Sequence, residues 1–75
     1  MTIGEVIRRY REDHNLSQRQ FALKCNISNG YISMLEKGIN PKTNEPIMPS
    51  IAALKAISSA MNISLNDLLI QADDM

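Results

Sequence analysis

The sequence is poor in the residues that build disulfides, metal centres and membrane spans. Its 75 residues include one Cys, one His, no Trp and only 4% aromatic residues. One Cys cannot form an internal disulfide, and one Cys with one His cannot supply a four-ligand zinc site. No apolar run is long enough to cross a bilayer, and no secretory signal follows Met1. We therefore expect one small domain with an aliphatic core, located in the cytoplasm, with no metal, no cofactor and no membrane association.

The sequence also has no excess of either charge, although its charges are unevenly distributed. The formal net charge is zero at pH 7. Residues 8–42 hold seven basic and three acidic side chains, whereas residues 43–75 hold one basic and four acidic side chains. The first of these regions could therefore attract phosphates. A solvated surface of mixed charge explains the same distribution, so charge alone does not decide the function.

The first half of the sequence has the start and stop signals of three helices. The motifs TIGE at residues 2–5 and SQRQ at residues 17–20 are capping boxes, which satisfy free backbone N–H groups at a helix start. Ser28 is the predicted N-cap of a third helix that ends at Gly38. The second and third helices are joined by a short segment around Asn26, a residue type that tolerates left-handed backbone.

The second half contains a loop and two further helices. Residues 39–48 hold two of the three prolines, and Asn44 is placed at the tip of this loop. Pro49 suits the first turn of a fourth helix. A helical period predicts these buried residues in the fourth and fifth helices: Ile51, Leu54, Ile57 and Met61, then Leu65, Leu68 and Leu69. The sequence predicts an all-α, five-helix domain over residues 1–70, with 71–75 as a tail or the start of a linker.

The third helix has an unusual exposed face. With Ile32 and Leu35 toward the core, a turn of 100° per residue fixes the opposite side. That side is small and polar with one cation: Gly30, Ser33, Met34 and Lys37, flanked by Asn29, Tyr31 and Glu36. Asn can pair with adenine, Met can contact a thymine methyl, and Gly allows close approach, so the face fits a DNA major groove. The simpler alternative is that Ser28 and Asn29 only cap the helix and that Gly30 is tolerated there.

Two short helices joined in this way, the second with a polar face, are typical of a helix-turn-helix. The order and spacing of the motifs resemble the phage repressor/Cro-type (XRE-family) helix-turn-helix domain. The resemblance covers residues 3–69, and it is carried by Arg11 five residues before Leu16, LSQ at 16–18, ISMLEKG at 32–38 and MNISLNDLL at 61–69. It implies a compact, lambda-repressor-like domain that inserts its third helix, about residues 28–37, into the major groove of double-stranded DNA.

The resemblance also implies roles for individual residues. Contacts to bases or to the DNA backbone fall on ten positions: Ser17, Gln18, Ser28, Asn29, Gly30, Tyr31, Ser33, Met34, Lys37 and Lys42. Arg11 and Glu36 match an internal, structural ion pair of the family. The loop at residues 39–48 is longer than in compact members. It either lies beside the phosphate backbone, with Lys42 in contact, or is solvent-exposed without a role.

The leading hypothesis is a sequence-specific transcription regulator, a prokaryotic or phage repressor that binds a palindromic operator as a homodimer. We expect the fifth helix to take part in the dimer surface, or a dimerising domain missing from this chain to do so. The alternative is an antitoxin or protein-interaction module with the same fold. An enzyme is least supported, because His14 fits a surface or capping role and Cys25 a core position, without a nucleophile–base set.

Overall fold

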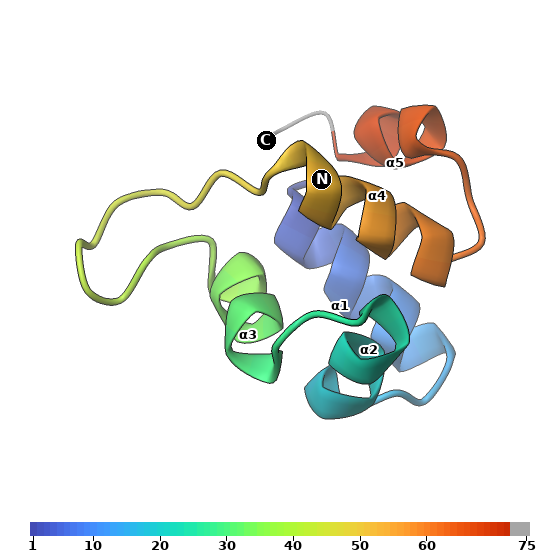
Figure 1. Cartoon of the computed structure of the whole chain (residues 1–75), viewed down its shortest axis with the longest axis horizontal. Helices are drawn as coiled ribbons and strands as arrows, with labels where there is room; N and C mark the ends of the chain where they lie inside the picture. Colours follow the sequence, from blue (N-terminus) through green and yellow to red (C-terminus); the bar gives the residue numbers. More distant parts are fainter. Residues whose placement is uncertain (73–75) are drawn as a thin grey trace.

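Five helices follow one another in residues 1–72, which are the residues that the computed structural model describes. They are α1 (Ile3–Asp13), α2 (Gln18–Cys25), α3 (Asn29–Lys37), α4 (Ile51–Ala60) and α5 (Leu65–Gln71). Figure 1 shows α4 crossing α1, with α5 on one side of them and α2 and α3 on the other. None of the helices in this part of the chain is long and apolar enough to cross a membrane.

The end of the chain bears on the predicted domain boundary. Helix α5 extends to Gln71, and Ala72 is 1% exposed, so both residues belong to the folded body. The rest of the predicted tail, residues 73–75, lies outside the described residues. The division of the chain at residue 70 stays a prediction.

The predicted helix starts in the first half are confirmed. The Thr2 hydroxyl accepts from the Glu5 N–H at 3.1 Å, and the Glu5 carboxylate accepts from the Thr2 N–H at 2.9 Å. Ser17 and Gln20 exchange the same two bonds at 3.0 and 2.8 Å. Ser28 caps α3 by accepting from the N–H group three residues further on. Each start is encoded locally, because the capping residues lie within four positions of one another.

The helix ends and the loop tip depend on left-handed backbone. The predicted positions Asn26 and Asn44 have φ angles of 58° and 59°, and Gly38 has 81°. These predictions are confirmed, since a residue in this conformation turns the chain out of the helix. Asn15, which follows α1, has a φ of 54°. Asn62, at 60°, turns the chain between α4 and α5 in the same way. No prediction from the sequence places a turn at Asn62.

Three predictions for α4 and α5 are wrong. Ser50 caps α4 by accepting from the Ala53 N–H at 3.1 Å, so Pro49 precedes the helix instead of lying in its first turn. Ile51 is 59% exposed, because it is the first residue of α4 and no described element covers that end. Leu69 is 37% exposed, because its neighbour Leu68 takes the position that faces the core. A helical period shows which residues share a face but not whether another element covers it.

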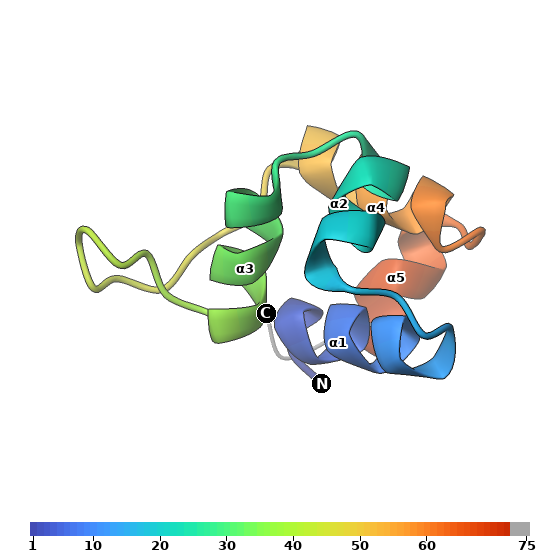
Figure 2. The same ribbon diagram turned by 90° about the horizontal axis from the view of Figure 1, so that it is seen from below.

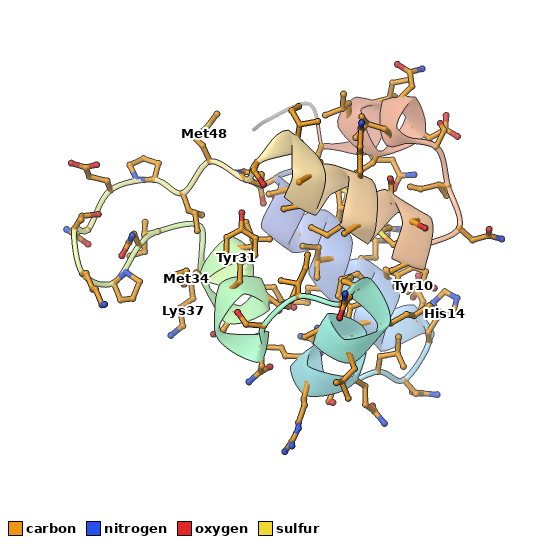
Figure 3. All side chains as sticks on the ribbon, in the orientation of Figure 1. Tyr10, His14, Tyr31, Met34, Lys37 and Met48 are labelled. Carbon is orange, nitrogen blue, oxygen red and sulfur yellow. The ribbon has the colours of Figure 1, made fainter. Side chains whose placement is uncertain are left out.

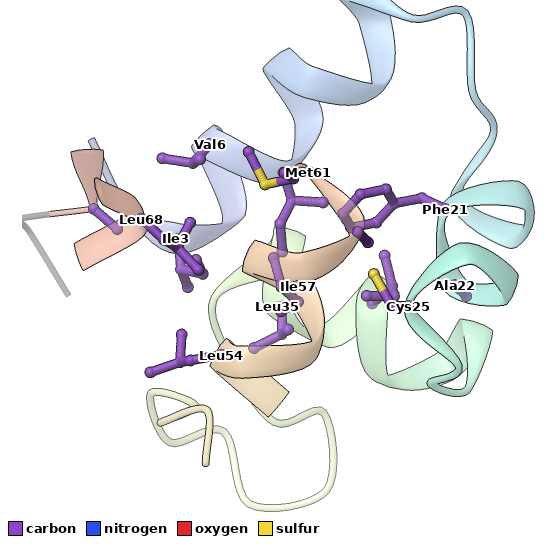
Figure 4. Packing of buried hydrophobic residues seen from close by; sticks show 14 residues of the cluster. Ile3, Val6, Phe21, Ala22, Cys25, Leu35, Leu54, Ile57, Met61 and Leu68 are labelled. Carbon is purple, nitrogen blue, oxygen red and sulfur yellow. The ribbon is translucent and has the colours of Figure 1, made fainter. Parts of the chain in front are cut away.

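The core lies where the five helices meet (Figure 4). Its largest fully buried side chains come from all five helices: Phe21, Ile7, Ile32, Leu35, Ile57 and Leu68. Cys25 is buried among them, and burial raises the pKa of its thiol to about 11. The thiol therefore stays protonated and packs as a small apolar side chain, which confirms its interpretation as a core residue.

Helices α1 and α3 approach each other closely at Gly4. A Cβ atom at Gly4 would lie 2.3 Å from the carbonyl oxygen of Leu35 and 2.8 Å from the Cα of Glu36. No real side chain fits that space, so only glycine allows this approach. The contact fixes where α3 sits on the body of the protein.

Candidate nucleic-acid interface

Helix α3 is held by its inner face and by the turn that precedes it. Ile32 and Leu35 are 0% and 1% exposed, as the sequence predicts. The turn from α2 is closed by a bond from the Ile27 N–H to the Ala22 carbonyl at 3.0 Å. Ile27 itself packs against the core. The direction of α3 relative to α2 is therefore fixed. Because Ile32 and Leu35 point into the core, the residues on the opposite side of α3 must face outward.

The outer face of α3 lines a shallow hollow of about 450 Å³. One residue of the following loop, Pro41, also lines this hollow. The other lining residues are six of the ten predicted DNA-binding residues: Ser28, Gly30, Tyr31, Ser33, Met34 and Lys37. Figure 3 shows Met34 and Lys37 extending from the side of α3 that faces away from the other helices. The hollow is wide and open, which suits a large partner better than an enclosed small molecule.

Two glycines on the two helices have opposite surroundings. Gly30 is exposed, and a Cβ atom placed there meets no described atom within 4 Å. The fold therefore does not require glycine at this position, unlike at Gly4. A glycine that the fold does not need, in a helix where it lowers stability, fits close approach of something outside the chain.

Tyr31 has a divided role in this face. Its ring is half-buried and packs against the core, while part of it still lines the hollow. It therefore supports the floor of the hollow more than it projects into it. Ser28, which also lines the hollow, uses its hydroxyl to cap the helix by accepting from the Tyr31 N–H at 3.1 Å.

The other four predicted DNA-binding residues do not line the hollow. Asn29 is exposed as the first residue of α3, and Lys42 is exposed on the loop after it. The Ser17 hydroxyl accepts from the Gln20 N–H as the cap of α2. Gln18 is half-buried and donates from its amide to the Glu36 carboxylate at 3.3 Å. These four side chains come from the start of α2, from the start of α3 and from the loop after α3.

Arg11 and Glu36 form a largely buried ion pair between α1 and α3. Arg11 Nε and Nη2 donate to the two carboxylate oxygens at 2.6 and 2.8 Å, and its Nη1 donates to the Leu16 carbonyl at 3.0 Å. The Glu36 side chain is 1% exposed. Two parallel bonds from a planar guanidinium fix both groups, so the pair orients α3 relative to α1.

The pKa of Glu36 reflects this environment. Burial raises the pKa of the carboxyl, but bonds from Arg11 and Gln18 and the Arg11 charge lower it by more. The net result is a pKa below the ordinary value of 4.5. Glu36 is therefore charged at neutral pH and accepts from three side chains, the third being Arg8 at 3.5 Å.

Three members of this region, Gly4, Arg8 and Pro41, are not predicted from the sequence. Gly4 could not be identified, because the backbone it approaches belongs to a distant segment. Arg8 lies one helical turn before Arg11, and this spacing is the signal that could have placed it on the same side of α1. Pro41 was assigned to a loop, without any sign that it would form a wall of the hollow.

The described residues contain no group of His, Cys, Asp and Glu that could hold a metal ion. His14 lies on the surface, where its ring stacks on Tyr10 at 4.0 Å and its Nδ1 lies 2.9 Å from the Tyr10 carbonyl oxygen. This is the capping arrangement expected for a histidine at the end of α1.

Two short helices joined by a tight turn, with the outer face of the second left open, define a helix-turn-helix domain. The helix-turn-helix family model matches residues 7–68, and the chain belongs to this family. The phage repressor/Cro-type resemblance and the lambda-repressor-like, all-α fold are thereby confirmed.

Similar proteins include regulators and a phage repressor. The transcriptional regulator SlrR of Bacillus subtilis (strain 168) is 35% identical over 66 residues, which cover 88% of this chain and 40% of SlrR. The immunity repressor of Bacillus phage phi105 is 30% identical over 66 residues, covering 88% of this chain and 41% of the repressor. The chain thus spans about two fifths of the length of these two relatives.

Solved structures of the biofilm regulator SinR also match. SinR in complex with DNA has a TM-score of 0.73 and 28% identity, covering 91% of this chain and 98% of that one. SinR in complex with the SinI protein has a TM-score of 0.74 and 25% identity, covering 99% of this chain and 67% of that one. The helix arrangement described above is therefore shared with a domain that binds DNA in its own crystal structure.

Proposed function

We propose that this chain is the DNA-binding domain of a sequence-specific transcription regulator that acts as a repressor. The observation that carries the proposal is the open outer face of α3, with six predicted contact residues around one hollow. A helix with this face uncovered can enter the major groove, which admits one α-helix. The similarity to SinR in complex with DNA and to the phi105 immunity repressor supports this assignment.

Each exposed group has a matching partner on DNA. The Asn29 amide can pair with the N6 and N7 atoms of adenine, and the Met34 side chain can contact a thymine methyl. Lys37 can contact a phosphate, and the first N–H groups of α3 form a site for another. The absence of a Cβ at Gly30 allows the helix backbone to lie close to the base edges. In this proposal the chain binds DNA in the cytoplasm and catalyses no reaction.

Specific repressors usually read two half-sites, so we expect a homodimer on a palindromic operator. Ile70 on α5 is 64% exposed, and Leu69 beside it is 37% exposed. These side chains offer an apolar surface for the predicted contact through α5. A dimerising domain outside this chain would serve the same purpose, since the relatives are longer than the chain.

The proposal is tested by selecting duplexes from a randomised pool and measuring their binding by fluorescence anisotropy. Asn29→Ala should weaken binding to the selected duplex by about 1–3 kcal/mol and relax the preference at one base position. Lys37→Ala should weaken binding to all duplexes alike. It should also lower the slope of log affinity against log salt concentration by about 1, the value for one lost phosphate contact. Lys55→Ala, an exposed lysine on α4, is the matched control and should change neither. Equal binding of selected and scrambled duplexes by the unmodified chain would overturn the proposal.

The second candidate function is a protein-interaction module, such as an antitoxin. The similarity to SinR in complex with SinI favours it, because a domain of this shape also occurs in a protein complex. The outer face of α3 argues for DNA, since a protein-binding face is typically more apolar and less rich in amides and lysine. The anisotropy experiment separates the two, because this module would show no base preference that depends on Asn29.

A further inference from the structure

The loop after α3 is an ordered hairpin. Ile39 and Pro46 form an antiparallel bridge. One residue further into the hairpin, the Asn40 N–H donates to the Glu45 carbonyl at 2.8 Å. Residues 38–47, hereafter the hairpin, therefore form two paired segments that leave α3 and return toward α4. The pairing gives this segment a definite direction relative to α3.

Bonds within the hairpin also fix its tip. The Asn40 side-chain Oδ1 accepts from the Lys42 N–H at 2.9 Å, and the main-chain carbonyl of Asn40 accepts from the Asn44 N–H at 2.7 Å. The Thr43 hydroxyl accepts from the Glu45 N–H at 3.4 Å. These bonds occupy backbone groups of the turn, while the side chains of Lys42 and Asn44 are exposed to solvent. The tip therefore presents one ammonium and one amide from a turn of defined shape.

The hairpin contributes little to the core. Figures 1 and 2, which are views at right angles, both show it projecting from the end of α3 beyond the rest of the described chain. Residues 41–46 are all exposed, and only Ile47 packs against the core. Ordering a backbone costs about 1–2 kcal/mol per residue, and here little apolar burial offsets that cost. A contact outside the chain is the role that this geometry leaves for the projecting residues.

The position of the hairpin relative to α3 indicates what it would contact. Pro41, the first residue of the hairpin's turn, lines the same hollow as Met34 and Lys37, so α3 and the hairpin are two walls of one hollow. If α3 occupies the major groove, the hairpin, which lies beside the last turn of α3, crosses the sugar–phosphate strand that borders this groove. On the far side of that strand is the minor groove, which is about 6 Å wide. The tip of a hairpin turn is narrower than a helix and can enter that space, whereas a helix cannot.

We propose that the hairpin crosses one DNA strand and places its tip, residues 42–44, in the minor groove. This inference rests on the proposed function and adds a second reading element to it. The Lys42 ammonium is attracted by the strong negative potential of a narrow A·T minor groove. The Asn44 amide can donate to adenine N3 or thymine O2, while the N2 amino group of guanine obstructs the same space. The hairpin thus selects A·T pairs at positions that α3 does not reach.

The test uses three versions of the selected duplex that differ only beside the α3 site. The flank holds A·T pairs, G·C pairs or inosine·C pairs. Inosine lacks the N2 amino group of guanine, so it changes the minor groove and leaves the major-groove pattern of G·C in place. We expect G·C flanks to bind about five- to tenfold more weakly than A·T flanks, the low end for one mismatched pair, and inosine·C flanks to recover most of this loss.

Two variants assign the effect to the tip. Lys42→Ala removes the ammonium, and Asn44→Gly removes the amide while keeping a residue that adopts the φ of 59° found there. Both should reduce the difference between A·T and G·C flanks to less than about twofold. Asn29→Ala is the matched control, because it weakens the α3 contact and should leave the flank preference in place.

The outcomes separate this inference from the proposed function. Equal binding of G·C and inosine·C flanks would overturn the minor-groove contact while leaving α3 as the reader. A flank preference that survives in both tip variants would do the same, because another element would then be responsible. If no duplex is preferred over scrambled DNA, the proposed function fails and the hairpin contact fails with it.

Discussion

Helix α3 has one face that the protein covers and one face that it leaves open. On the covered face, Ile32 and Leu35 are buried and the Glu36 carboxylate is bound by Arg11. On the open face, Gly30 and Lys37 border a hollow with no side chain of the core above it. The covered face is specified by the fold, whereas the open face has side chains that the fold does not need. The difference indicates which residues determine stability and which are available for recognition.

Two glycines show this difference at the level of single atoms. At Gly4 an added Cβ would collide with the backbone of α3, and at Gly30 it would lie in open space. The same residue type is thus required by packing in one helix and unexplained by packing in the other. Changes on the covered side should alter the free energy of unfolding, and changes on the open side should alter DNA binding.

The largest expected loss of stability follows from breaking the Arg11–Glu36 ion pair between α1 and α3. Arg11→Ala leaves the Glu36 carboxylate buried with only Gln18 and the partly exposed Arg8 beside it. Removing one partner of a buried pair is strongly destabilising, so we expect a loss of about 3 kcal/mol in the free energy of unfolding measured in urea. Complete loss of the cooperative transition would agree with this. Arg9→Ala, an exposed neighbour on α1, should stay within about 0.5 kcal/mol; equal losses in both variants would contradict the role of the pair.

The next effect concerns the contact between α1 and α3. Gly4→Ala places a Cβ 2.3 Å from the Leu35 carbonyl oxygen, so the two helices must move apart. Overpacking typically costs about 1–3 kcal/mol, and the better helix propensity of alanine returns up to about 1 kcal/mol. We expect a net loss of about 1–2 kcal/mol in urea unfolding. A variant as stable as the unmodified protein would show that the close approach is not required.

A smaller effect is expected on the pH dependence of stability, because Glu36 stabilises the fold only in its charged form. Its pKa is lowered in the folded protein, so its stabilisation is present above the ordinary pKa of 4.5 and is lost as pH falls through the lower, folded value. The difference in unfolding free energy between the unmodified protein and Glu36→Gln should therefore narrow below pH 4.5. The Glu5 carboxyl, whose pKa is lowered by bonds to Thr2, titrates in both proteins, so its contribution cancels in this difference. A difference that stays constant with pH would contradict the assignment.

The features that the sequence predicts correctly are local ones. The caps at Thr2, Ser17 and Ser28 and the turn at Asn26 depend on residues within about four positions, so a short window contains all the partners. The buried pair Ile32 and Leu35 follows from helical geometry once the helix start is known. The open face of α3 could therefore be predicted as the complement of its covered face.

The features that the sequence does not predict depend on distant segments. The need for glycine at position 4 is set by the backbone of Leu35, and the bond from Gln18 to Glu36 joins residues 18 positions apart. The exposure of Ile51 depends on which element covers the start of α4. The direction of the hairpin depends on cross-strand bonds that begin at Ile39 and on its packing beside α3. Helical periodicity and capping motifs involve only residues close together in the sequence, so they do not predict these contacts.

The smallest expected effect on stability is at Gly30. Gly30→Ala adds a Cβ into open space and improves helix propensity, so the free energy of unfolding should stay the same or rise by up to about 1 kcal/mol. DNA affinity should fall in the same variant, because the added methyl group occupies the space between the helix backbone and the base edges. Urea unfolding and anisotropy on one preparation measure both quantities. If stability rises and affinity does not fall, Gly30 is only tolerated in the first turn and α3 does not approach the bases as closely as proposed.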